Sequence, residues 1–528
     1  MSRLVEHMTS ALTSSPHDVH VLGPDNESWT AHSWGEVHVR AENFAEAIHD
    51  HGPAEAVALI GEPSIELLSA IFGSWLAGAS VALLPGPVRG ADPAQWSQAT
   101  LNRCRDIGVS SVYSHGARLA DLQFSDARGH VHDVSALAHP RRSTTLRPAS
   151  TERPAILQGT AGSTGTPKTA RLSHEAVLAN VSGITERVGM HRDRDCGLSW
   201  LPLYHDMGLI FLLTTAMSGL PAWQAPTSAF SAMPFRWLGW LDHSRATLTA
   251  APNFAYNVLG KYARRLPDCD LSAVRFALNG GEPVDCAGMV RFASELGRFG
   301  FDGGALSPAY GMAESTCAVS ITPPGDGLLV DEVRVDTAEG EKVQRHAILG
   351  NAVRGMEIRI EPVDFPVAEA AGRDAGEVQV RGESMMTGYL GDAPHDATSW
   401  FGTGDLGYFT DDGLVVCGRV KELIHIAGRN VFPSEIERIA GQVPGVREGS
   451  VVAVGSAEKS ARPGLVIAAE FRGGDEEETR TTLVRKVASE CGVVPAKVLF
   501  VEPGTLPRTS SGKLRRLEVQ QTLVADRG

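Results

Sequence analysis

Short apolar runs alternate with longer amphipathic segments along the first part of the chain. The runs at 19–23 (VHVLG), 56–61 (AVALIG) and 80–85 (SVALLP) have the length and composition of buried strands. The segments at 33–52 and 64–78 have helical spacing of apolar residues, and each ends in glycine. This alternation predicts an α/β domain with a largely parallel sheet.

One stretch of this region, residues 67–84, carries no charge and approaches the length of a membrane span. Gly73 and Gly78 dilute it, and Pro85 ends it. We therefore predict a buried helix that runs into a core strand, and no membrane insertion.

The end of the chain has a different pattern. Strands are expected near 450–455 and 464–471, with a helix opening at Pro433 and another over 476–490. With 528 residues, more than one hydrophobic core is expected. We predict a compact α+β C-terminal domain over 420–528 and a large α/β N-terminal domain over 1–419.

Composition narrows the class of protein. Hydrophobic residues make up 43% and charged residues 21%, which is ordinary for a globular protein. The net charge of −14, without a long basic run, argues against a nucleic-acid partner or an anionic membrane surface. The seven cysteines show neither C-x-x-C nor zinc spacing, and the N-terminus lacks an export signal, so free thiols and a cytoplasmic location are expected.

A candidate phosphate loop, TAGSTGTPK, occupies residues 160–168 between a predicted strand and a predicted helix that opens at Ser173. Glycine allows close approach of the backbone, and successive amides with hydroxyl groups form a concave anion site. Lys168 adds a positive charge. The order of residues is not that of a Walker loop, and a plain polar loop is the alternative interpretation.

Two further motifs carry ionisable groups after apolar runs. In residues 199–210 (SWLPLYHDMGLI), His205 next to Asp206 is either an oriented imidazole or a structural histidine at a helix start. In residues 308–316 (PAYGMAEST), Tyr310 could stack on a base and Glu314 could hold Mg²⁺ on a triphosphate.

The remaining motifs are ordinary loops when each is taken alone. LNGGEPV at 278–284 is a strand that runs into a turn, and TGDLGY at 403–408 offers Asp405 at a strand end as an acceptor for ribose hydroxyls. PRTSSGKLRR at 507–516 presents Lys513 on an exposed tip. A region rich in tryptophan and phenylalanine over 220–262 is expected to pack in the core, with some rings at an apolar substrate pocket.

In their order along the chain, these motifs and GRVKELI at 418–424 resemble those of the acyl-adenylating superfamily, which includes acyl-CoA synthetases, nonribosomal adenylation domains and luciferases. The resemblance covers nearly the whole chain. SWLPLYHDMGLI, APNFAY, PAYGMAES and GRNVFPSEIE look most like fatty acyl-AMP ligases. The resemblance implies a large domain of layered α/β subdomains and a small mobile domain hinged near Lys421.

The implied reaction has two halves. A carboxylic acid and ATP give acyl-AMP and pyrophosphate with Mg²⁺, and the acyl group then passes to a thiol of CoA or of a carrier-protein phosphopantetheine. The resemblance implies Lys513, His205 and Glu314 as catalytic residues, with Glu314 also the metal ligand. The implied nucleotide-binding residues are Thr160, Gly162, Ser163, Thr164, Gly165, Lys168, Gly280, Gly281, Glu282, Pro283, Tyr310, Gly311, Met312, Ala313, Asp405 and Arg419. The expected acyl pocket contains Tyr204, Trp223 and Phe254.

The phosphate loop departs from the family pattern at three positions. Gly159 stands where an aromatic residue is usual, Ala161 where serine is usual and Thr169 where glycine is usual. Loss of one charge-assisted hydrogen bond at 161 would cost roughly 1.5–3 kcal/mol. Two alternatives follow: an enzyme that only makes thioester from a ready-made acyl-AMP, and a non-catalytic protein that binds an adenylate.

Overall fold

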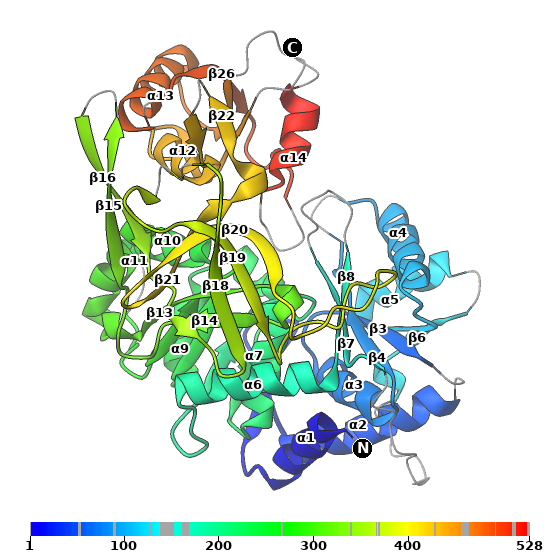
Figure 1. Cartoon of the computed structure of the whole chain (residues 1–528). Coiled ribbons are helices and arrows are strands. Elements are labelled where there is room, and N and C mark those ends of the chain that lie inside the picture. Colours follow the sequence, from blue (N-terminus) through cyan, green and yellow to red (C-terminus); the bar gives the residue numbers. More distant parts are fainter. Residues whose placement is uncertain are drawn as a thin grey trace.

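The computed structural model describes most of the chain. The described residues are 2–50, 54–87, 91–126, 129–137, 153–160, 168–265, 268–337, 340–365, 367, 370–426, 429–455, 464–491, 493–508 and 514–524. Within them, a large unit of three main sheets and a two-stranded sheet precedes a smaller C-terminal unit, coloured orange to red at the top of Figure 1. This confirms the predicted α/β class with a second, smaller domain.

The first sheet of the large unit is the parallel sheet predicted from the alternating pattern. Its strands, in spatial order, are β6 (Val131–Asp133), β5 (Ser111–Ser114), β3 (Ala56–Ile60), β4 (Ser80–Leu83), β7 (Ile156–Gly159) and β8 (Thr169–Leu172). All neighbours are parallel except β7 and β8, which are antiparallel and pair Gly159 with Thr169. The candidate phosphate loop therefore joins two adjacent strands.

Four helices accompany this sheet: α2 (Trp34–Asp50), α3 (Ile65–Leu76), α4 (Pro93–Asp106) and α5 (Gly116–Ser125). Ser64 caps α3 by accepting a hydrogen bond from the Leu67 amide, and Gly78 follows the helix with φ of 77°. The uncharged stretch 67–84 is thus a buried helix that leads into β4, as predicted. No helix in the described ranges is long and apolar enough to cross a membrane.

The second sheet has nine strands within the described residues. In spatial order they are β17 (Asn351–Ala352), β14 (Ala318–Ile321), β13 (Leu306–Gly311), β12 (Phe276–Asn279), β11 (Leu248–Ala251), β9 (Gly197–Ser199), β10 (Ala222–Gln224), β1 (Asp18–Leu22) and β2 (Trp29–Ser33). The strands from β13 to β1 in this order are parallel, and antiparallel strands close both edges.

Helices of both sheets meet in one hydrophobic core that runs through the large unit. The helices of the second sheet are α1 (Arg3–Ser14), α6 (His174–Val188), α7 (Asp206–Met217), α8 (Thr227–Ala232), α9 (Arg236–Ser244), α10 (Asn253–Tyr262) and α11 (Cys286–Leu296). Helix α6 begins after Ser173, which caps it as predicted. Most of the predicted aromatic cluster forms a separate core against α9, α10 and α11.

An antiparallel sheet of the large unit lies below the C-terminal unit in Figure 1. Its strands are β18 (Met356–Pro362), β19 (Gly376–Gly382), β20 (Phe401–Thr410) and β21 (Gly413–Arg419), and a hairpin of β15 (Val330–Thr337) and β16 (Gly340–Ala347) stands beside it. Asp405 was expected at a strand end but lies inside β20, paired with Arg419 next to a β-bulge. A TGD sequence resembles a turn, yet the bulge lets β20 continue past it.

The C-terminal unit is an α+β fold with its own core. It contains β22 (Ile424–Ile426), β23 (Arg429–Val431), α12 (Pro433–Ala440), β24 (Val446–Gly455), β25 (Leu465–Phe471), α13 (Glu476–Cys491), β26 (Pro495–Val501), α14 (Arg516–Val519) and a π-helical turn (Gln520–Val524). Short 3₁₀ turns elsewhere are Ser135–Leu137, Ala263–Arg265, Gly297–Phe299, Gly303–Ala305, Ala313–Ser315 and Val420–Glu422. Strand β21 ends at Arg419 and the last of these turns begins at Val420, and the domain boundary at 419/420 stays a prediction.

Candidate active site

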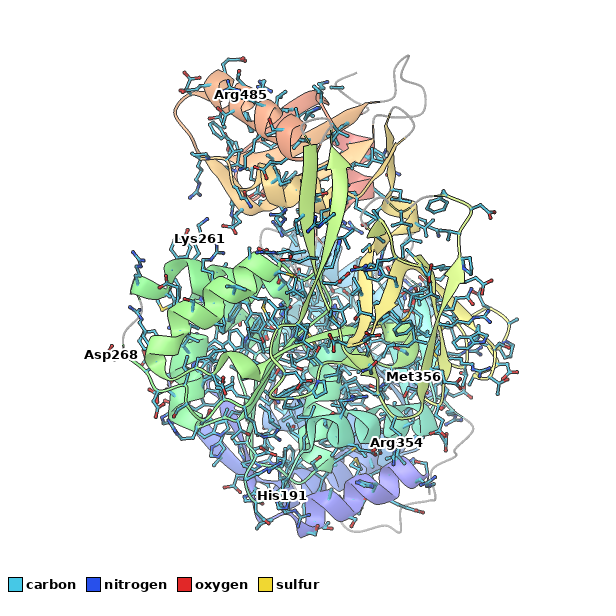
Figure 2. All side chains as sticks on the ribbon, turned by 60° about the vertical axis from the view of Figure 1, so that its left-hand side comes forward. His191, Lys261, Asp268, Arg354, Met356 and Arg485 are labelled. Carbon is cyan, nitrogen blue, oxygen red and sulfur yellow. The ribbon has the colours of Figure 1, made fainter. Side chains whose placement is uncertain are left out.

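A cavity of about 3900 Å³ runs between the second sheet, the antiparallel sheet and the C-terminal unit. Residues of every motif that the structure describes line it, from Thr160 and His205 to Tyr310, Asp405 and Arg419. At its margin, Lys261 lies on the edge of the large unit that faces the C-terminal unit (Figure 2). The fold therefore brings together motif residues that are as much as 259 positions apart in sequence, such as Thr160 and Arg419.

At one end of the cavity, three side chains form a hydrogen-bonded group. The Tyr310 hydroxyl donates to Asp405 Oδ2 at 2.6 Å, and Arg419 Nε donates to Asp405 Oδ1 at 2.9 Å. Burial raises the pKa of the Asp405 carboxyl, and Arg419 and Tyr310 oppose that shift without cancelling it. Burial and the charge of Asp405 raise the pKa of Tyr310 well above its usual value, so this hydroxyl remains a donor. The group suits a ligand with vicinal hydroxyls beside a flat ring.

Glycines allow two turns to approach this end of the cavity. Gly280 to Pro283 follows β12, and Gly281 has φ of 77°, a left-handed conformation that favours glycine. The Glu282 carboxylate accepts from the Phe254 amide at 3.2 Å, which ties the turn to α10. At Gly311 a Cβ would lie 1.9 Å from the Cys317 carbonyl oxygen, so β13 can turn back into β14 only without a side chain there.

The base of the phosphate loop lies where β7 pairs with β8. The Thr160 amide donates to the Lys168 carbonyl at 2.9 Å, which closes the loop above the β7–β8 pair. Thr160 and Lys168 both line the cavity. The predicted phosphate-binding residues Gly162, Ser163, Thr164 and Gly165 lie outside the described residues, and so does Ala161.

Glu314 stands on the short 3₁₀ turn after β13 and meets a partner that the sequence did not indicate. The Tyr389 hydroxyl donates to Glu314 Oε1 at 2.6 Å, and the Lys168 ammonium lies 4.4 Å from the centre of the Tyr389 ring. Lys168 also contacts Asp392 Oδ2 at 3.3 Å. Tyr389 thus connects the predicted metal ligand to the predicted phosphate-loop lysine; aromatic composition alone gives no signal for this role.

The surroundings of Glu314 fit a magnesium ion held partly by substrate. In the described part of the chain, no three His, Cys, Asp or Glu side chains gather as a metal site. Mg²⁺ commonly takes one or two carboxylates and completes its octahedron with water and substrate phosphates. A single carboxylate in the same cavity as a phosphate loop meets that requirement.

His205 precedes α7, where Asp206 orients its ring. Asp206 Oδ1 lies 2.5 Å from His205 Nδ1 and also accepts from the Met207 amide at 2.8 Å. The neighbouring Tyr204 lines the cavity, and burial, with the nearby charge of Glu62, raises the pKa of its hydroxyl to about 12. His205 has 30% of its side chain exposed, so it can meet a ligand in the cavity.

An apolar branch of the cavity continues between α6, α7 and the second sheet. It is lined by Ile184, Met190, Ile210, Phe211, Phe276 and Leu278. Phe254 lines the cavity, whereas Trp223 does not belong to the lining within the described residues. The Trp223 ring stacks on His20 at 3.9 Å and packs edge-on against Trp29, because β10 directs it toward the first strands of the chain.

Lys513 lies outside the described residues, but the segment after it is anchored near the expected hinge. Leu514 lines the cavity. Arg516 donates to Glu422 Oε2 at 2.9 Å and to both Glu437 oxygens at 2.7 Å. Glu422 follows Lys421, which lines the cavity as well. The C-terminal helix is therefore tied to the turn that joins the two units.

Comparisons with known proteins agree with this arrangement. The family model described as AMP-binding enzyme matches residues 9–390, and that of the AMP-binding enzyme C-terminal domain matches 428–519. A Mycobacterium tuberculosis protein named only as a ligase is 35% identical, with 98% of each chain covered. A long-chain-fatty-acid–AMP ligase of Mycolicibacterium smegmatis is 30% identical, covering 88% of this chain and 84% of the relative. A solved structure, from a study of fatty acyl-adenylate ligases of E. coli and L. pneumophila, is 31% identical with a TM-score of 0.88, covering 99% of this chain and 98% of that one.

Proposed function

The chain belongs to the family of AMP-binding enzymes that form acyl-adenylates, and we propose that its cavity is the site at which an apolar carboxylic acid is joined to AMP. In this reaction a carboxylate oxygen attacks the α-phosphorus of ATP. A bond forms between that oxygen and phosphorus, and the bond to the bridging oxygen of the β-phosphate breaks. Acyl-AMP and pyrophosphate are the products.

One observation carries the proposal. The cavity contains, in continuous space, the Tyr310–Asp405–Arg419 group, the pair formed by Glu314 and Tyr389, and an apolar branch. These three parts match a nucleoside, a metal-bound phosphate chain and an acyl chain.

The charges in the cavity suit attack of one anion on another. Coulomb repulsion between carboxylate and triphosphate opposes this step, so the site must supply positive charge and fixed geometry. Lys168 and the amides of its loop are proposed to hold the β- and γ-phosphates, and Asp405 the ribose hydroxyls. Mg²⁺ bound through Glu314 would neutralise phosphate charge. Lys513 is proposed to contact the carboxylate and the α-phosphate, and the turn at Lys421 to be the hinge that brings it in and removes it.

The adenylate then needs an acceptor. We propose a thiol at the end of a phosphopantetheine arm, which CoA and a carrier protein share, entering where the two units face each other. His205 is oriented by Asp206 beside the cavity, and we propose that it lies near the thiol as the acyl group moves from phosphate oxygen to sulfur. Incubation of acyl-AMP with CoA or with a holo-carrier protein distinguishes the two sources.

Exchange of labelled pyrophosphate into ATP tests the first half directly. We expect exchange that depends on a medium- or long-chain carboxylic acid. In Lys513→Ala the exchange rate should fall at least about a hundredfold, the scale of a lost catalytic charge contact. Lys486→Ala, the same change at a lysine of α13 that does not line the cavity, is the matched control. Absence of exchange with every acid, together with thioester formation from synthetic acyl-AMP, would replace the proposal with the half-reaction alternative. Binding of acyl-AMP without turnover in either assay would support the alternative of a non-catalytic adenylate-binding protein.

A further inference from the structure

Arg103 is a cation of the cavity that no motif of the family pattern includes. It lies in the last turn of α4, and its guanidinium donates a hydrogen bond to the Thr169 hydroxyl on β8. Figure 1 shows α4 beside β8 on the outer side of the first sheet. Arg103 lines the same cavity as Thr160 and Lys168, the two ends of the phosphate loop. A positive group from a distant helix therefore lies at the base of that loop.

The two strands that flank the loop leave room for this guanidinium. Gly159 and Thr169 are cross-strand partners, so side chains at these positions project to the same face of the sheet. A Cβ added at Gly159 would meet nothing within 4 Å, whereas Thr169 is buried with 5% of its surface exposed. An aromatic side chain at 159 would fill the face on which Thr169 contacts Arg103. Glycine at 159 thus leaves space for the Arg103 guanidinium, and threonine at 169 accepts a hydrogen bond from it.

The geometry points to Arg103 as a binding residue for the pyrophosphate end of ATP, positioned by the Thr169 hydroxyl. This inference rests on the proposed adenylation, in which residues 160–168 hold the β- and γ-phosphates. A guanidinium carries five N–H groups in a planar fork, so it can donate to Thr169 and to a phosphate oxygen at the same time. Ala161 lacks a hydroxyl that could bind phosphate, and Arg103 supplies a charge-assisted contact at the base of the same loop. The departures at 159 and 169 then belong to one phosphate site that includes Arg103.

The test measures pyrophosphate exchange and AMP binding in the full-length protein. Arg103→Ala is expected to raise KM for ATP and for pyrophosphate about ten- to hundredfold, the scale of one charge-assisted hydrogen bond. The dissociation constant for AMP, which lacks the β- and γ-phosphates, should stay within about twofold of wild type. Arg103→Lys should recover part of the loss, since a lysine keeps the charge without the fork.

Arg105→Ala is the matched control, because Arg105 is exposed in the same helical turn and donates to Asn102. It should leave both KM values unchanged. Thr169→Val removes the hydroxyl at nearly constant volume and should raise KM for pyrophosphate about three- to tenfold, as expected for loss of a net hydrogen bond. When Thr169→Val is already present, Arg103→Ala should raise KM for pyrophosphate by a smaller factor than it does in wild type. This coupling is expected of two residues that act as a unit.

The possible outcomes separate the inference from the proposed function. Exchange by wild type that Arg103→Ala leaves within twofold overturns the inference alone. A parallel loss of AMP affinity in Arg103→Ala overturns it as well, since that result indicates a structural defect. Absence of exchange by wild type overturns the proposed function and with it the inference.

Discussion

At the scale of single residues, burial changes the pKa of side chains where the nucleoside is proposed to bind. Asp405 is 5% exposed, and its carboxylate has Tyr310 and Arg419 as donors. Burial raises its pKa, so the ionised form that a ribose diol requires is less stable here than in water. The two donors keep that form accessible at neutral pH, and removal of either one should favour the protonated acid.

Tyr310→Phe tests this balance. The variant removes one hydrogen bond to the ionised Asp405, so KM for ATP should rise about tenfold at neutral pH. Nucleotide binding should weaken as pH falls through the pKa of Asp405, which lies above the usual aspartate value of about 3.9. In Tyr310→Phe this loss should begin at higher pH, because the ionised form has lost a donor. KM for ATP measured across the acidic range reports both effects.

Tyr408→Phe is the matched control on the same strand. The Tyr408 hydroxyl donates to Asp331 at 2.7 Å, away from the cavity lining. That variant should lower stability and leave the pH dependence of KM unchanged. If KM for ATP rises over the same acidic pH range in wild type and in Tyr310→Phe, that result would contradict the proposed role of Asp405.

At the scale of elements, one buried ion pair holds three parallel strands of the second sheet in register. Asp195 precedes β9 and has no exposed side-chain surface. Arg275, which precedes β12, donates to both of its oxygens at 2.7 Å, and Thr247, which precedes β11, donates at 3.0 Å. These strands lead into the cavity at their opposite ends, so the pair supports the site without touching it.

Asp195→Asn should therefore destabilise the large unit. Burial raises the pKa of Asp195, but hydrogen bonds from Arg275, the His191 amide and Thr247 outweigh burial and hold it below its usual value. The pair thus contributes stability above about pH 4, the unfolded pKa, and this contribution is lost as pH falls through the lower native pKa. We expect a loss of about 3 kcal/mol at neutral pH, at the low end for a buried pair because Arg275 is 28% exposed.

Urea unfolding at neutral and acidic pH measures the free energy of unfolding of wild type and of Asp195→Asn. The difference between the two values should shrink on acidification. Asp193→Asn changes an aspartate two residues away that is 78% exposed, and it should cost less than about 0.5 kcal/mol. A difference between wild type and Asp195→Asn that stays constant down to the acid transition would contradict the assigned role of the ionised carboxylate.

At the scale of the whole molecule, polar contacts join the two units. Glu448 on β24 accepts from Lys261 on α10 at 2.6 Å and lies 3.5 Å from Arg291 on α11. Gln344 of the β15–β16 hairpin donates to Glu435 on α12 at 2.6 Å. Such contacts are part-exposed, and ion pairs of this kind contribute at most about 1 kcal/mol each. Contacts of this strength are compatible with the movement of the C-terminal unit that is proposed between the two half-reactions.

Glu448→Lys should shift the arrangement of the units. Three positive charges would then meet at one contact, so small-angle X-ray scattering should show a larger radius of gyration at low salt than for wild type. Salt screens the repulsion over about 10 Å at 0.1 M, and the difference should narrow at high ionic strength. Glu478→Lys makes the same change on α13, the outer helix that also carries Arg485 (Figure 2), and should leave the radius unchanged. Equal scattering from Glu448→Lys and wild type would indicate that other contacts hold the units.

Local pattern determined much of this molecule. The alternation of apolar and amphipathic segments predicted β3, α3, β4, α6 and α13 because strand and helix periodicities are properties of adjacent residues. The order of short motifs indicated the family, and several of these motifs line one cavity. Asp405 was wrongly placed at a strand end, because the sequence does not show that a β-bulge lets β20 continue past it.

Tertiary structure alone decided which distant residues meet. Tyr389 bonds Glu314 from 75 positions away and Arg103 bonds Thr169 from 66, whereas Trp223 faces the N-terminal strands instead of the cavity. The physical reason is that a side chain's periodicity specifies its face on its own element. Its partner across space depends on the path of the whole chain, which local spacing does not contain.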